Sequence, residues 1–148
     1  MSDRAPKLAS VGAFLLAVVG LAGLLYRQSL FATGPIGFAI QGLAVLLMAW
    51  ARVTFGMRSF HAAANPTAGG LVTTGPYRYL RHPIYAAILY FVAVGVVSHP
   101  TLWSAGMGAL IVLGLGVRIV AEERLVREMY PEYEEYAERT KRVIPFLL

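Results

Sequence analysis

Four long apolar runs, separated by short polar segments, dominate the pattern of this 148-residue chain. The first extends from Leu8 to Tyr26, and at 1.5 Å per residue it would form a helix roughly 28 Å long, close to the hydrocarbon thickness of a bilayer. The others cover residues 36–51, 83–99 and 101–121. We therefore predict an all-α membrane protein with four transmembrane helices, built as one integral membrane domain over residues 1–148.

Polar residues inside and after these runs refine the prediction. Gln41 is the one strongly polar side chain in the second run, and we expect it to bond a neighbouring helix rather than to face a cavity. The helical pattern of the fourth run continues into the charged segment 122–129. Pro131 then breaks the pattern and is expected to start a short helix that carries residues 132–136 in a cytosolic C-terminal segment.

Composition and charge agree with a membrane location. Hydrophobic residues make up 57% of the chain and charged residues only 14%, which is too apolar for an ordinary soluble domain. The absence of cysteine excludes disulfides and thiolate metal sites. The charged residues that give the net charge of +5 lie between the apolar runs rather than over a soluble surface. This distribution indicates membrane topology rather than nucleic-acid binding.

The distribution of basic residues predicts the orientation. All thirteen Lys and Arg residues except Arg27 lie before the first run, between the second and third, or from Arg118 onward. The positive-inside rule then places both termini in the cytoplasm of a multi-pass protein, which we expect in a bacterial or archaeal cell membrane. The segment before the third run and the C-terminal segment would thus meet at one face.

The segment from Gly75 to Tyr85 carries two prolines, three tyrosines, two arginines and a histidine. Pro83 suits the first turn of a helix, and it keeps His82 out of helical geometry. A helix start beside Arg81 and His82 could bind an anion through its main-chain N–H groups. The alternative is that these Arg and Tyr side chains only anchor a membrane helix at the interface.

Arg118 and Glu122 are four residues apart and share one helix face at the end of the fourth run. An arginine in an apolar turn is costly unless it faces the helix bundle or water. Together with Tyr77, His82 and Tyr85, these groups would suit a zwitterionic ligand that carries an aromatic ring. The alternative is an ordinary interfacial ion pair.

Metal binding is not predicted, because the only histidines, His61, His82 and His99, form no pair at helical ligand spacing. The chain also lacks a Walker loop, a GxGxxG after a strand and a GxSxG. Soluble nucleotide-binding and hydrolase templates are therefore excluded.

Two motifs carry a family resemblance. Residues 71–85 read LVTTGPYRYLRHPIY, and the later segment reads EERL at 122–125, YPEY at 130–133, Tyr136 and RVIP at 142–145. Both motifs, in this order, resemble the signatures of the isoprenylcysteine carboxyl methyltransferase family of integral membrane enzymes. The resemblance covers roughly residues 71–145, and the first two runs match only in being apolar.

The resemblance implies S-adenosylmethionine as methyl donor and a lipophilic acceptor, an isoprenylcysteine-type carboxylate or another lipid head group, that enters from the bilayer. Arg118 matches the family's substrate-side arginine, and with Glu122 it would serve catalysis. A carboxylate acceptor needs no base, whereas an amine would need Glu122 or Glu123. The implied cofactor-binding residues, within the motif segments 71–85 and 118–136, are Leu71, Val72, Tyr77, His82, Pro83, Ile84, Tyr85 and Glu122.

Several points stay open at this stage. The upstream glutamine that some family members use has no equivalent here, and His61 could substitute for it. An NADPH-dependent lipid or sterol reductase shares a similar Arg-His-Pro region, and a non-catalytic membrane module could keep the motifs for packing. The sequence selects neither the methyl acceptor nor the oligomeric state.

Overall fold

The computed structural model describes residues 4–56 and 70–144. Within these ranges the chain is helical and contains no sheet, only one isolated parallel bridge, so the all-α prediction is confirmed. The elements are α1 (Arg4–Tyr26), α2 (Gly34–Phe55), the short 3-10 helix η2 (Gly75–Arg78), α3 (Pro83–Ser98), α4 (Leu102–Met129) and α5 (Tyr133–Arg139).

Three of these helices are long and apolar enough to cross a membrane, so the chain is a multi-pass membrane protein. They are α1 over Leu8–Tyr26, α2 and α4. The expected third span is α3, an apolar helix of 16 residues, which at about 24 Å is shorter than a typical span. Four spans were thus predicted and three helices are long enough to be candidates, because the third apolar run is itself short, limited by Pro83 at its start and the His99-Pro100 reversal at its end.

Helix boundaries otherwise follow the predicted pattern closely. α2 continues to Phe55, beyond the predicted end at Ala51. α4 runs without a break from the apolar layer through the charged segment to Met129, as the sequence indicated. α5 begins at Tyr133, two residues after Pro131.

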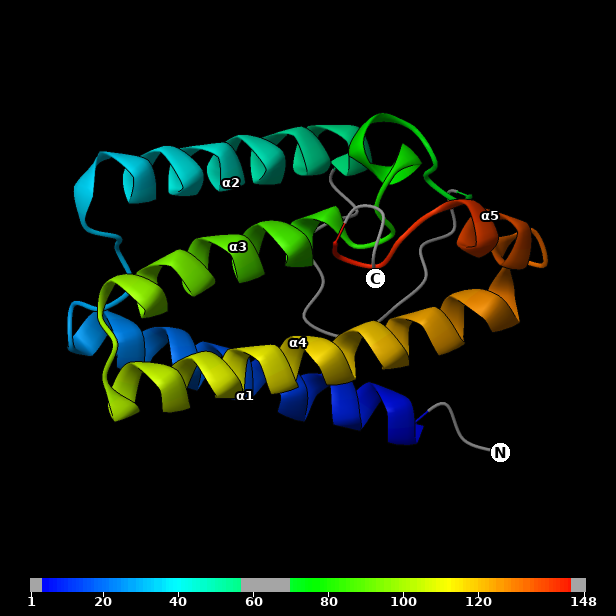
Figure 1. Cartoon of the computed structure of the whole chain (residues 1–148). Coiled ribbons are helices and arrows are strands. Elements are labelled where there is room, and N and C mark those ends of the chain that lie inside the picture. Colours follow the sequence, from blue (N-terminus) through cyan, green and yellow to red (C-terminus); the bar gives the residue numbers. More distant parts are fainter. Residues whose placement is uncertain (1–3, 57–69, 145–148) are drawn as a thin grey trace.

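The helices lie side by side in the order α2, α3, α4 and α1 (Figure 1). α1 packs along α4, α2 packs along α3, and the contact between α3 and α4 is much smaller. Small residues allow the first of these contacts, since a methyl group on Gly114 of α4 would clash with the Ala13 carbonyl oxygen of α1. The fold therefore consists of two helix pairs that share a hydrophobic core, in which Val92 of α3 belongs to the same buried cluster as Leu24 of α1 and Ile111 of α4.

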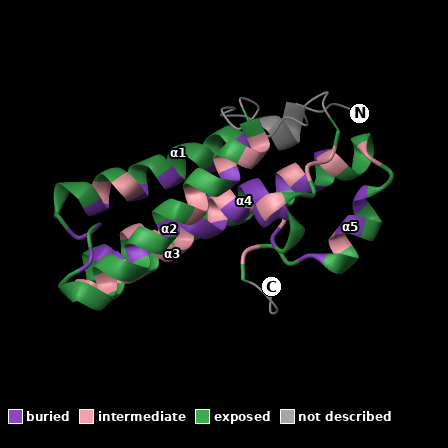
Figure 2. Cartoon of the chain, turned by 90° about the horizontal axis from the view of Figure 1, so that it is seen from above, coloured by how far each residue is buried: buried purple, intermediate pink, exposed green. Residues whose placement is uncertain are grey.

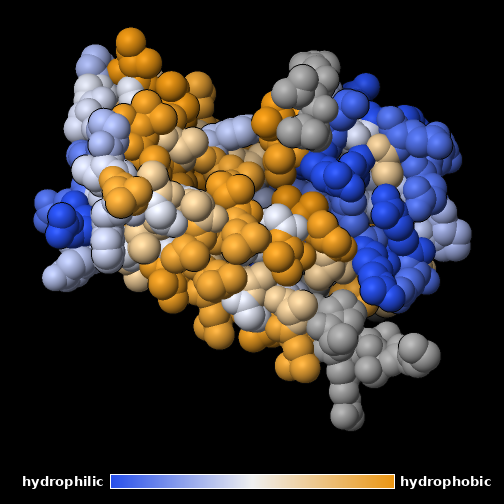
Figure 3. Space-filling view, turned by 60° about the horizontal axis from the view of Figure 1, so that its bottom comes forward, coloured by the Kyte–Doolittle hydropathy of each residue, from blue (hydrophilic) through white to orange (hydrophobic). Residues whose placement is uncertain are grey.

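Figure 2 shows that the outward faces of the helices are exposed and the inward faces hold the buried residues, and many of the exposed side chains are large and apolar. Large side chains on α2 such as Leu43, Leu46 and Val53 are exposed. The molecular surface accordingly shows a hydrophobic band between two hydrophilic ends (Figure 3). This distribution suits a bilayer, which would cover the band.

The Gln41 side chain of α2 forms hydrogen bonds at one end of the α2–α3 pair. Its amide oxygen accepts from the Ala32 main-chain N–H at 3.0 Å, and its amide nitrogen donates to the carbonyls of Leu30 at 2.9 Å and Phe91 at 3.0 Å. The predicted interhelical bond is therefore confirmed. It also satisfies the main chain of the loop that joins α1 to α2.

The opposite end of the molecule gathers the beginning of α1, the end of α2, η2, the beginning of α3 and α5 (Figure 1). There the segment before α3 pairs with the segment after α5. The Arg81 N–H donates to the Lys141 carbonyl at 2.6 Å, and the Lys141 N–H donates to the Tyr79 carbonyl at 3.1 Å. This pairing brings the two sequence motifs together at one end of the helix bundle.

Candidate active site

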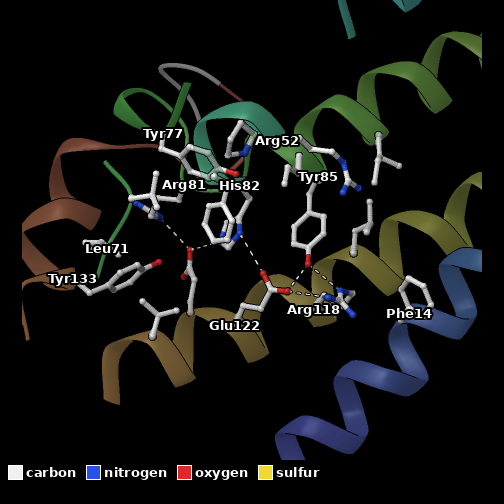
Figure 4. Close-up of a pocket in the computed structure, with 18 of the residues that line it drawn as sticks. Phe14, Arg52, Leu71, Tyr77, Arg81, His82, Tyr85, Arg118, Glu122 and Tyr133 are labelled. Carbon is white, nitrogen blue, oxygen red and sulfur yellow. Dashed lines mark hydrogen bonds and ion pairs between the residues drawn. The ribbon is translucent and has the colours of Figure 1, made fainter. Parts of the chain in front are cut away.

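A cavity of about 300 Å³ lies at this end, between the two helix pairs (Figure 4). All of the residues that the sequence singled out for donor binding or catalysis line it, although they come from two motif segments that are far apart along the chain. They are Leu71, Val72, Tyr77, His82, Pro83, Ile84, Tyr85, Arg118 and Glu122. The contact between α3 and α4 is smaller than the contact within either helix pair, which leaves room for the cavity, and the pairing of the two motifs closes one side of it.

Arg118, Glu122 and Tyr85 form one hydrogen-bonded group in the cavity wall. Arg118 donates to the Tyr85 hydroxyl oxygen through Nε at 2.9 Å and to Glu122 Oε1 through Nη2 at 3.0 Å. The Tyr85 hydroxyl in turn donates to Glu122 Oε1. Arg118 is only 4% exposed, so these partners compensate much of the cost of placing its charge among apolar helices.

His82 lies between two carboxylates. Its Nδ1 is 3.8 Å from Glu122 Oε2 and its Nε2 is 3.4 Å from Glu123 Oε1. The imidazole also stacks on the Tyr85 ring, with ring centroids 5.7 Å apart. The main-chain N–H of His82 donates to the Arg142 carbonyl at 3.0 Å. His82 therefore contributes to the surroundings of Glu122, and its own N–H is already used at the helix start where an anion site was expected.

Glu123 holds the cavity wall together. Its carboxylate is 3% exposed and accepts from Arg81 Nε at 3.1 Å and Arg142 Nη2 at 3.1 Å. Arg81 also donates through Nη1 to the carbonyls of Ala137 and Thr140, both at 2.6 Å. The hydrogen bond to Glu123 raises the pKa of Arg142. These bonds give Glu123 a structural role, so Glu122 is the better of the two candidate bases.

Tyrosine rings cover the polar side of the cavity, with Tyr77 from η2 and Tyr133 and Tyr136 from α5. Burial raises the pKa of Tyr136 to about 12, so its phenol stays protonated and donates to the Tyr77 carbonyl at 2.7 Å. Burial also raises the pKa values of Tyr77 and Tyr133. The cavity thus offers neutral aromatic faces beside charged groups.

Several lining residues were missed by the sequence reasoning. Arg52, in the last turn of α2, lines the cavity, and so do residues of α1, for which only a membrane span was predicted. α1 contributes four residues to the lining, Phe14, Ala17, Val18 and Leu21. Their spacing of three, four and seven residues places them on one helix face, but α1 is apolar on every side, so its sequence does not distinguish that face. His61, the suggested substitute for the absent glutamine, falls outside the part of the chain that the structure describes.

Comparison with protein families agrees with the motifs. The family model described as isoprenylcysteine carboxyl methyltransferase (ICMT) matches residues 36–128, which is more than half of the chain. The match includes α2, η2 and α3 and most of α4, and it leaves out α1.

Two curated relatives are similar to part of the chain. The nickel-cobalt-cadmium resistance protein NccN of Alcaligenes xylosoxydans xylosoxydans is 33% identical over 78 residues, which are 52% of this chain and 37% of the relative. The cobalt-zinc-cadmium resistance protein CzcN of Cupriavidus metallidurans is also 33% identical over 78 residues, 52% of this chain and 36% of the relative. The match thus spans little more than a third of either relative. No solved structure matches the chain.

Proposed function

Since the chain belongs to the isoprenylcysteine carboxyl methyltransferase family, we propose that it transfers a methyl group from S-adenosylmethionine to a lipophilic acceptor. One observation carries this proposal. Residues from two motifs, separated along the chain by most of α3 and α4, line a single cavity that contains a carboxylate, an arginine and several aromatic rings.

The cavity suits the chemistry of the methyl donor. Its volume of about 300 Å³ lies at the lower end of the range for small-molecule sites. Glu122 would hold the donor's ammonium group, and the faces of Tyr77 and Tyr85 would stabilise positive charge and stack on the adenine. Leu71 and Val72 would cover the apolar parts of the donor. When bound, the donor supplies an electrophilic methyl group on a sulfonium.

The other half of the cavity suits a lipid. Its wall consists of apolar side chains from α1, α3 and α4, including Val18, Ile88 and Leu115. Phe14 and Val18 line the cavity and are also 39% and 42% exposed. The cavity wall therefore reaches the hydrophobic outer surface beside α1, where a lipid tail could enter from the bilayer.

Arg118 contacts both kinds of cavity wall, because it bonds to Glu122 and lies against the Phe14 ring. Its guanidinium would orient the acceptor's nucleophilic atom, which attacks the methyl carbon while the bond between that carbon and sulfur breaks and its electrons stay on sulfur. A carboxylate acceptor loses no proton in this step, whereas an amine would give its proton to Glu122. The protein would otherwise act by alignment and by exclusion of water.

We place this site at the cytosolic face, because the motif-bearing end carries the predicted positive charge bias. The names of the two relatives concern metal resistance. Within residues 4–56 and 70–144, no three His, Asp or Glu side chains are grouped to hold a metal ion.

Calorimetry and product analysis test the proposal. The purified protein in detergent should bind S-adenosylhomocysteine, the demethylated donor, and should show no comparable heat with NADPH. Incubation with a methyl-labelled donor and a membrane lipid extract should place the label in a lipid that mass spectrometry can identify. Binding of NADPH without binding of S-adenosylhomocysteine would overturn the proposal in favour of a reductase.

Variants separate catalysis from a packing role. Glu122→Gln should weaken binding of S-adenosylhomocysteine, while Glu128→Gln, at an exposed ion pair with Arg124 outside the cavity, should leave it unchanged. A folded Glu122→Gln protein with wild-type binding and wild-type methyl transfer would favour a non-catalytic module.

A further inference from the structure

Phe14 touches Arg118 from α1, a helix outside the family match. The Phe14 ring centroid lies 5.5 Å from the guanidinium carbon of Arg118, and the Tyr85 ring centroid lies 5.7 Å from the same carbon. The guanidinium therefore lies between a ring of α1 and a ring of α3 (Figure 4). Both distances fall within the roughly 6 Å over which an aromatic face attracts a cation.

Close backbone packing between α1 and α4 fixes Phe14 in this place. Gly114 approaches α1 so closely that a methyl group on it would clash with the Ala13 carbonyl oxygen and would lie 3.1 Å from the Ala17 main-chain nitrogen. Arg118 follows Gly114 by about one helical turn, on the same face of α4. The glycine contact thus sets the Phe14 ring beside the guanidinium.

Arg118 needs such a constraint because a long cationic side chain in an apolar layer tends to extend toward the nearest water. Glu122 and Tyr85 hold the guanidinium by hydrogen bonds from the α3 and α4 side. Phe14 closes the α1 side and lines the cavity at the same time. Phe14 thus combines contact with Arg118, a place in the cavity wall and an origin in α1.

We propose that Phe14 is a positioning residue for methyl transfer: its ring holds the Arg118 guanidinium in the orientation that presents the acceptor to the methyl donor. This inference rests on the proposed function, and it adds α1 to the machinery that the family motifs define. Loss of the ring should impair alignment of the acceptor and leave the affinity for the methyl donor unchanged.

The test compares Phe14→Leu, which keeps an apolar side chain without a ring, with Phe14→Tyr, which restores the ring. Phe38→Leu is the matched control, because Phe38 on α2 is 58% exposed and does not line the cavity. For each variant we would measure thermal unfolding, affinity for S-adenosylhomocysteine and the initial rate of methyl transfer to the lipid pool that the wild type labels.

Phe14→Leu should lower the rate of methyl transfer about 2- to 30-fold, the range expected for losing a cation–aromatic contact. Its affinity for S-adenosylhomocysteine should stay within about 2-fold of wild type, and Phe14→Tyr should recover most of the rate. If Phe14 served packing alone, Phe14→Leu would lower the unfolding temperature, but the methyl-transfer rate would not fall separately from donor affinity, or Phe14→Tyr would not restore the rate.

The inference fails if Phe14→Leu transfers methyl groups as fast as Phe38→Leu, or if it weakens donor affinity as much as it lowers the rate. Those results leave the proposed function standing, since the wild type would still bind S-adenosylhomocysteine and label a lipid. A wild-type protein that binds no S-adenosylhomocysteine would overturn the proposed function, and this inference with it.

Discussion

Glu123 links α4 to the two paired segments, through Arg81 before α3 and Arg142 after α5. Neutralising its carboxylate should separate these segments from α4. The variant Glu123→Gln keeps the size of the side chain and removes one negative charge. Its partner Arg81 is largely buried, at 11% exposed, while Arg142 is 47% exposed. Breaking a buried ion pair costs about 3 to 5 kcal/mol, whereas a half-exposed pair adds less than about 1 kcal/mol. Because glutamine can still accept one hydrogen bond, we expect a loss of about 3 kcal/mol.

For a chain of this length, that loss corresponds to a fall of about 6 to 12 °C in the unfolding midpoint. Thermal unfolding in one detergent measures it, and hydrogen exchange should show faster exchange in α5 and in the paired segments before the helix pairs open. Glu128→Gln is the control, since its ion pair with Arg124 is exposed and should contribute less than about 0.5 kcal/mol. If both variants unfold at the same temperature, the structural role assigned to Glu123 is wrong.

Three further substitutions test other parts of the structure. Glu122→Gln should weaken S-adenosylhomocysteine binding by at least about 10-fold in calorimetry, with a smaller fall in unfolding temperature than Glu123→Gln, because Glu122 is 23% exposed and faces the cavity. Gln41→Leu should destabilise the protein by about 1 to 3 kcal/mol in denaturant unfolding, since it leaves buried main-chain groups without their partner. Gly95→Ala should lower the unfolding temperature because its methyl group would clash with the Leu30 carbonyl, whereas Gly116→Ala, with open space around it, should not.

Much of the fold could be predicted because long apolar runs admit few alternatives. A run such as Leu8–Tyr26 must be a helix in a bilayer, and Gln41 inside such a run must find a partner. The pairing of helices was not predictable in the same way. α1 is apolar on every side, so its sequence shows no preferred face, and its contact with α4 depends on small residues such as Gly114.

The cavity could be anticipated in part because both motifs were expected at the same end of the bundle. Glu122 and Arg118 share a helix face, which placed them correctly. Glu123 was offered as an alternative base, but consecutive residues of a helix point about 100° apart. Both carboxylates line the cavity, but Glu123 turns toward Arg81 and Arg142 and is only 3% exposed. Only the fold of the C-terminal segment shows that these partners occupy its carboxylate.

The bonds of Glu122 suggest how donor and acceptor binding would be coupled. In the structure one carboxylate accepts from Arg118 and Tyr85 and lies beside His82. If Glu122 takes the donor's ammonium as proposed, it must share its negative charge, and Arg118 then loses part of its compensation in an apolar layer. An electron-rich acceptor would again compensate the positive charge of Arg118. The Phe14 ring would keep the guanidinium within reach of that acceptor. We therefore expect S-adenosylhomocysteine to bind more tightly when an acceptor or a lipid analogue of it is present, and independent binding of the two would refute the coupling.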